Sequence, residues 1–128
     1  MKALLDTHVL AWWLTDDARL SGRARLILRQ PDNSIWVSPV SGWELATKAR
    51  IGKLQGFAHL VPKLPELVAE ASFSVLPVTL EHAIRAGAIR HAHKDPFDRM
   101  LVAQANLESM VLVTSDPICA SLGARTTW

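Results

Sequence analysis

Short apolar runs alternate with longer stretches of helical spacing along this chain of 128 residues. The clearest run is Met110–Val113, and similar runs occur at Lys2–Leu5, Ile35–Val37 and Ser74–Leu76. Runs of this length and branched-residue content are typical of buried strands. Because helical patterns separate them, we expect an α/β fold with three layers, α/β/α, around a central and mainly parallel sheet.

The segments between the strands predict helices, whose ends follow from capping and helix-breaking residues. The expected helices are Thr7–Leu14, Ser21–Leu28, Gly42–Ile51, Leu60–Ala71, Thr79–Ile89 and Phe97–Leu107. Either Ser38 or Ser41 is expected to cap the third of them. Thr114–Pro117 predicts a turn, and Arg125–Trp128 predicts a final edge strand.

Composition narrows the class of protein. With 49% hydrophobic and 20% charged residues, residues 1–128 are expected to form one globular domain. A single cysteine, Cys119, excludes an internal disulfide and favours a reducing, cytoplasmic setting. No apolar stretch reaches the length of a membrane span, so no membrane association is expected. The net charge of +2 is too small to indicate a partner.

Four of the twelve acidic residues map to one edge of the predicted sheet. Asp6 and Asp116 follow the first and last buried strands, and Glu44 and Asp98 are expected in the first turns of helices. The carboxyl ends of parallel strands share one edge, which is where α/β sheets bind ligands. For the two acids on helices, the helix dipole is a simpler explanation, and Glu44 can also pair with Lys48.

Carboxylates that converge in this way need positive charge. Two like charges about 4 Å apart repel by about 4 kcal/mol at an effective dielectric constant of about 20. A divalent cation resolves this, and oxygen ligands favour Mg²⁺ or Mn²⁺. Metal-dependent hydrolysis of a phosphoester is therefore the leading hypothesis. The alternative is metal-free acid–base cleavage by a pair of the histidines His8, His91 and His93.

Four segments carry a resemblance to a known family. Leu4–Leu10 resembles the opening motif of PIN domains, and three further segments resemble later motifs in the same order: Ser38–Lys48, His93–Ala105 and Leu112–Asp116. The likeness covers essentially the whole chain, including the terminal Trp128. Its size and motif style resemble the VapC branch, the ribonuclease toxins of VapBC toxin–antitoxin pairs.

This resemblance implies a PIN fold, dependence on Mg²⁺ or Mn²⁺, and endonucleolytic hydrolysis of RNA. It assigns catalysis and metal binding to Asp6, Glu44, Asp98 and Asp116. Asp95, Thr114 and Thr7 are expected to support these ligands, with Thr114 orienting the last acid. Whether Asp95 or Asp98 contacts the metal stays open, although the register of the following helix favours Asp98. Arg99 and Lys94 are candidates for contact with the RNA backbone.

The same resemblance implies protein partners, namely a cognate VapB-like antitoxin and a second copy of the chain in a homodimer. A groove for the antitoxin is expected along Trp12, Trp13, Leu14, Trp43 and Ile51, although each tryptophan can also be an ordinary core residue. The alternative function is a catalytically silent module that binds RNA or protein. Without the four acids, fourteen basic and eight acidic residues give +6, which suits a polyanionic partner.

Overall fold

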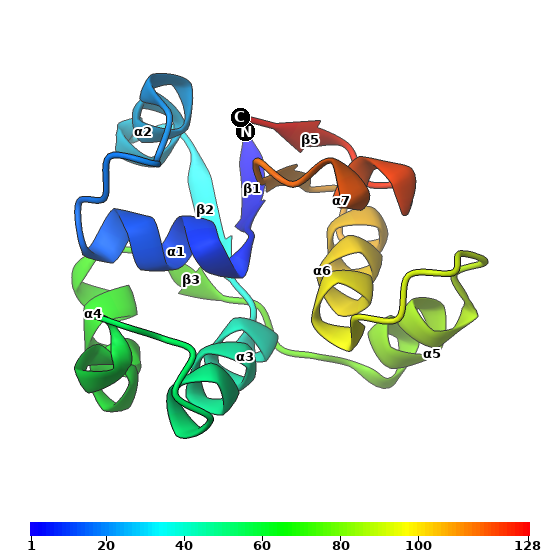
Figure 1. The fold of residues 1–128 in the computed structure, drawn as a ribbon. Helices are drawn as coiled ribbons and strands as arrows, with labels where there is room; N and C mark the ends of the chain where they lie inside the picture. The colour runs from blue at the N-terminus through cyan, green and yellow to red at the C-terminus, as the bar shows by residue number, and fades with distance from the viewer.

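Five parallel strands form the centre of the fold in a computed structural model that describes residues 1–128 (Figure 1). The strands are β1 (Lys2–Leu5), β2 (Ser34–Val37), β3 (Ser74–Val75), β4 (Val111–Val113) and β5 (Thr126–Thr127). Their order in the sheet is β3-β2-β1-β4-β5, and in the central ladders Ala3 pairs with Ile35 of β2 and Val111 of β4. The predicted parallel sheet is confirmed, and β5 is an edge strand as expected.

Helices cover both faces of this sheet (Figure 1). They are α1 (Thr7–Leu14), α2 (Gly22–Arg29), α3 (Pro39–Arg50), the 3₁₀ helix η1 (Ala58–Lys63), α4 (Leu64–Glu70), α5 (Leu80–Ala88), α6 (Pro96–Leu107) and α7 (Pro117–Ser121). Ala3 and Leu5 of β1 pack into the core on the side of α1 to α4, whereas Leu4 packs into the core on the side of α6 and α7. This alternation is the two-residue period of a strand buried on both faces, and it gives the three expected layers.

Two expected helices and one expected turn differ from the structure. The helix expected at 42–51 begins at Pro39, because the Ser38 side chain accepts the Val40 N–H and proline fits the first turn. The helix expected at 60–71 is divided into η1 and α4, since prolines at 62 and 65 interrupt regular hydrogen bonding. Residues 114–117 lead into the unpredicted helix α7, which Asp116 caps.

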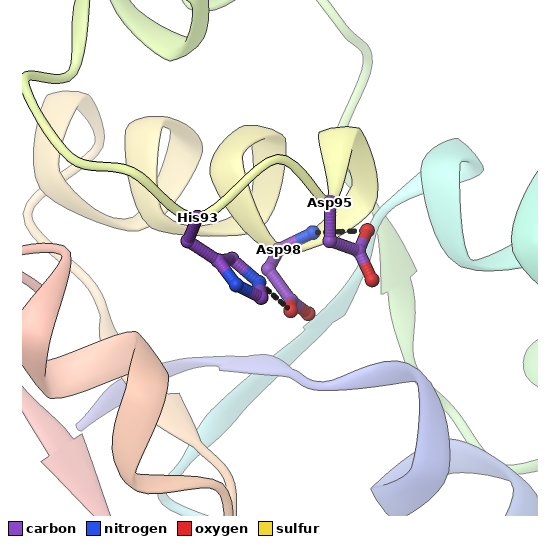
Figure 2. Close-up of side chains that lie close together, drawn as sticks. All are labelled: His93, Asp95 and Asp98. Atoms are coloured by element: carbon purple, nitrogen blue, oxygen red, sulfur yellow. Dashed lines mark hydrogen bonds and ion pairs between the residues drawn. The ribbon is translucent and has the colours of Figure 1, made fainter.

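The topology fixes which side chains meet. Asp6 follows β1 and caps α1, and Asp116 follows β4 and caps α7. Because β1 and β4 are neighbouring parallel strands, both acids lie at the same edge of the sheet. The start of α6 also faces this edge, beside the point where β1 passes into α1 (Figure 2). The structure contains no helix long and apolar enough to cross a membrane.

Candidate active site

Asp6 is the most enclosed acid of the site, with 5% of its surface exposed. Its backbone N–H donates to the Val113 carbonyl oxygen, which continues the pairing of β1 with β4. One carboxylate oxygen accepts the Thr7 N–H at 2.7 Å, and the other accepts the Thr114 hydroxyl at 2.6 Å. The Thr7 hydroxyl in turn contacts Ser41 of α3 at 3.0 Å. Burial raises the pKa of the Asp6 carboxyl above its ordinary value, despite these hydrogen bonds.

Thr114 joins the first and the last acid of the site. Its hydroxyl donates to Asp6 and accepts the backbone N–H of Asp116 at 3.0 Å. The Asp116 carboxylate accepts the Ile118 N–H at 3.0 Å as the cap of α7. The resemblance implied that Thr114 orients the last acid, and in the structure its hydroxyl proton goes to Asp6 while its oxygen holds the backbone of Asp116.

Glu44 is buried, with 4% of its surface exposed, and its carboxylate is only half satisfied. One oxygen pairs with the Lys48 ammonium at 2.6 Å, whereas Oε1 has no hydrogen-bond partner. Because α3 begins at Pro39, Glu44 lies in its second turn, so the expected placement in the first turn was wrong. The helix dipole acts mainly on the first turn and does not explain this acid. A buried carboxylate oxygen without a partner is costly, and a cation would satisfy it.

Asp95, Asp98 and His93 form a compact group at the start of α6 (Figure 2). Asp95 caps the helix, with one oxygen accepting the N–H groups of Phe97 at 2.8 Å and Asp98 at 3.3 Å. Asp98 Oδ2 is hydrogen-bonded to His93 Nε2 at 2.8 Å. One ligand atom from each residue lies within 4.8 Å of the others. Asp95 therefore caps the helix, and Asp98 contacts His93; which of the two acids would contact a metal ion stays a prediction.

The acids affect one another electrostatically, which indicates that they lie near one another. Burial raises the pKa of Asp98, and the negative charges of Asp95, Asp6 and Glu44 raise it further. Burial also raises the pKa of the Cys119 thiol to about 12. The charges of Asp6, Asp98 and Asp116 add to that increase. Acids from four separate segments of the chain therefore act on one another and on one buried thiol.

This donor set fits a divalent cation. The site combines several carboxylates, one buried carboxylate oxygen without a partner, and two acids whose pKa values burial raises. Lys48 supplies one positive charge, and its ammonium is paired with Glu44 alone. Carboxylate oxygens are the ligands that Mg²⁺ and Mn²⁺ prefer. The arrangement can hold such an ion at the sheet edge and bring phosphate oxygens to it.

Arg99 is committed to the protein backbone. Its guanidinium donates to four carbonyl oxygens at the end of α5 and in the following loop, those of Ala86, Ile89, His91 and His93. Four of its five N–H donors are therefore already used within the protein, and contact of Arg99 with RNA stays a prediction. Lys94 is exposed in the same loop and stays a candidate for that contact. The sequence gives no sign of the loop carbonyls that Arg99 binds, because backbone acceptors look alike at every residue.

Trp12 lines a cavity of about 730 Å³ beside the acids. The cavity is also lined by His8, Lys48 and Phe57. The guanidinium carbon of Arg19 lies 5.1 Å from the centroid of the Trp12 ring. Aromatic and basic groups therefore lie next to one another within reach of the acidic site. This is the surface on which one part of the expected antitoxin groove lies.

The other expected groove residues do not line that cavity. Trp13 and Leu14 are partly buried against the core, which agrees with the simpler explanation for Trp13. Trp43 is 59% exposed, so it is not a core residue. Its ring packs edge to face against that of Phe97, with the ring centroids 4.8 Å apart. Ile51 is also exposed, at the end of α3. The five residues expected to line the groove are thus divided among the cavity, the core and the exposed face of α3.

Comparison with known proteins agrees with this geometry. The PIN domain family matches residues 3–123. The chain therefore belongs to the PIN domain family.

Particular relatives narrow the position within that family. The chain is 31% identical over 114 residues to Ribonuclease VapC22 of Mycobacterium tuberculosis, covering 88% of this chain and 85% of that protein. It is similar in fold to a chain of VapBC2 from Rickettsia felis, bound to a promoter DNA fragment, with 15% identity, a TM-score of 0.72 and coverage of 99% and 98%. It is also similar to a chain of VapBC-1 from nontypeable Haemophilus influenzae, with 16% identity, a TM-score of 0.69 and coverage of 99% and 97%. Within the PIN family it is a VapC-type protein.

Proposed function

We propose that the chain is a single-domain, metal-dependent endoribonuclease and the toxin of a type II toxin–antitoxin pair. The observation that carries this proposal is the electrostatic convergence of acids from separate segments around Glu44, whose buried Oε1 has no partner. The relative VapC22 is named a ribonuclease, which supports RNA as the substrate. The cysteine content, one buried thiol without a disulfide, suits action in the cytoplasm.

The proposed metal ligands are Asp6, Glu44, Asp98 and Asp116. A bound Mg²⁺ or Mn²⁺ supplies Lewis acidity that activates water and neutralises charge on the phosphate. Thr7 and Thr114 hold both oxygens of Asp6, so this carboxylate is oriented before an ion arrives. His93 holds one oxygen of Asp98, Oδ2, in the same way.

The protein around the acids would draw in the substrate. Without the four proposed ligands the chain carries a net +6, from fourteen basic and eight acidic residues. Such a surround attracts the phosphate backbone, and Lys94 is exposed beside the site to contact it. Selectivity then depends on the shape of the RNA and on contacts with loops.

A VapB-like antitoxin is the proposed inhibitor. Similar structures bear the name VapBC, and one is named a toxin–antitoxin complex from Klebsiella pneumoniae. The cavity beside Trp12 is the proposed docking surface, because its aromatic and basic lining adjoins Lys48 and the acids. A bound segment there would cover the approach of RNA to the site.

A second copy of the chain is the other proposed partner. Leu80 and Ile84 lie four residues apart on α5 and are 78% and 65% exposed. Side chains at this spacing lie on one face of a helix, and exposed apolar patches commonly mark interaction surfaces. A homodimer through α5 would bury both side chains.

The test is cleavage of RNA by the purified chain, free of antitoxin, with Mg²⁺ or Mn²⁺. We expect cleavage that EDTA stops, and Asp6→Asn is expected to abolish it with the fold retained. Asp32→Asn, which neutralises an exposed acid in a turn away from the site, is the matched control. Sequencing the 5′ ends of cut RNA would define the targets. Activity that survives EDTA would favour the histidine route, and uncut RNA in every condition would favour the silent binding module.

A further inference from the structure

His93 gives the proposed metal site a nitrogen atom that the acidic residues do not provide. Its Nε2 lies 2.8 Å from Asp98 Oδ2, and ligand atoms of His93, Asp95 and Asp98 lie within 4.8 Å of one another. Figure 2 shows the side chain of His93, from the loop before α6, on the same side as those of Asp95 and Asp98 at the start of that helix. Only one oxygen of Asp95 serves as the helix cap, so its second oxygen remains for another contact.

The backbone that carries His93 is held from two directions. Arg99 Nε donates to the His93 carbonyl oxygen at 2.7 Å. The backbone N–H of His93 donates to Nδ1 of His91 at 3.0 Å. The imidazole is therefore presented by a loop that is fixed by the protein itself, and such preorganisation is what a metal ligand requires.

The spacing of these atoms suits two ligands on one ion. Adjacent ligands of an octahedral ion, each about 2.1 Å from the metal, stand about 3 Å apart. The 2.8 Å between His93 and Asp98 is close to that spacing. A separate observation also favours cation binding here, since the buried Oε1 of Glu44 has no hydrogen-bond partner and the charge of Glu44 acts on Asp98.

We propose that His93, with Asp98 and Asp95, forms a mixed nitrogen and oxygen site for a divalent transition-metal ion. Imidazole nitrogen binds transition metals in preference to Mg²⁺, whereas carboxylates alone discriminate little. The chain should thus bind Mn²⁺ more tightly than Mg²⁺, because His93 replaces one oxygen ligand. This inference rests on the proposed function only in sharing Asp98 with the catalytic acids.

Mn²⁺ itself is the probe for a direct test by electron paramagnetic resonance. The wild-type chain with Mn²⁺ should show coupling of the ion to ¹⁴N, and His93→Asn and His93→Gln should abolish that coupling. Loss of a direct ligand should weaken Mn²⁺ binding at least about ten-fold, the lower end of what loss of supporting partners costs. Mg²⁺ binding, measured by competition with Mn²⁺, should weaken less than Mn²⁺ binding in these variants. His8→Asn removes a nearby exposed histidine and should leave the ¹⁴N coupling unchanged.

Two results would overturn the inference. The first is a wild-type Mn²⁺ complex without ¹⁴N coupling. The second is equal weakening of Mn²⁺ and Mg²⁺ binding in both His93 variants, which would make His93 only a hydrogen-bond partner of Asp98. Either result leaves the proposed ribonuclease intact, because that proposal fails on a different measurement, full cleavage by Asp6→Asn. Circular dichroism of each variant would verify that the fold is retained.

Discussion

Arg99 is expected to stabilise the folded protein, because its hydrogen bonds hold the loop that carries His93. In Arg99→Met, carbonyls of Ala86, Ile89 and His93 lose partly buried hydrogen bonds at 2.7–3.1 Å. A hydrogen bond from a charged group contributes about 1.5–3 kcal/mol to the free energy of unfolding. In the variant, water can hydrogen-bond to some of the freed carbonyls, so we expect a loss of about 1 kcal/mol for each bond. When the exposed hydrogen bond to His91 is included, the free energy of unfolding should fall by about 2–4 kcal/mol. For a chain of this length that lowers Tm by about 8–16 °C.

Urea unfolding and calorimetry would measure this loss. Arg99→Lys should recover only part of it, because an ammonium cannot reproduce the planar fork of donors. Arg90→Met, an exposed arginine nearby, is the matched control and should stay within about 0.5 kcal/mol of wild type. Arg99→Met could instead unfold like wild type but bind RNA more weakly and with a smaller salt dependence. That result would refute the stabilising role of Arg99 and favour its contact with RNA.

Three further outcomes are expected. Burial raises the pKa of Asp6, so its ionised form costs stability as pH rises above the ordinary carboxyl range. Asp6→Asn should therefore raise Tm without metal at neutral pH and reduce the stabilisation by Mg²⁺, as thermal melts would show. With a thiol pKa of about 12, Cys119 should resist a disulfide reagent at pH 8 until the chain is unfolded, and rapid labelling of folded protein would contradict this. Ile84→Glu should give a monomer by light scattering with its fold retained by circular dichroism, and a persistent dimer would exclude α5 as its interface.

Sequence patterns predicted the parts of the site that depend on topology. Asp6 and Asp116 were placed together because parallel strands end at one edge, and this needs only the strand order along the chain. The position of Glu44 was wrong by one helical turn. Pro39 was not taken as the first residue of a helix, although serine followed by proline is a normal helix start. Local capping chemistry was therefore the missing step for this acid.

Other features of the site could not be predicted from sequence. Arg99 binds four backbone carbonyls, and these acceptors carry no mark of residue type. His93 was considered only for acid–base catalysis, because its 2.8 Å contact with Asp98 depends on how the loop before α6 is folded. The division of the expected groove depends on how far each side chain extends from the surface, as for the exposed Trp43. These are properties of tertiary packing, which a local pattern does not contain.

If the proposed function is right, the distribution of charge would link ion binding to RNA binding. The acids that would hold the ion repel phosphate when no cation is present, and burial raises the pKa values of Asp6 and Asp98, so their ionised forms are disfavoured in the folded protein. The charge of Lys48 is already offset by its pairing with Glu44. The basic surround can draw RNA to the surface, but a phosphate can approach the sheet edge only after an ion has reversed the local charge. Ion and RNA should therefore bind with positive coupling, which thermodynamic linkage makes equal in both directions.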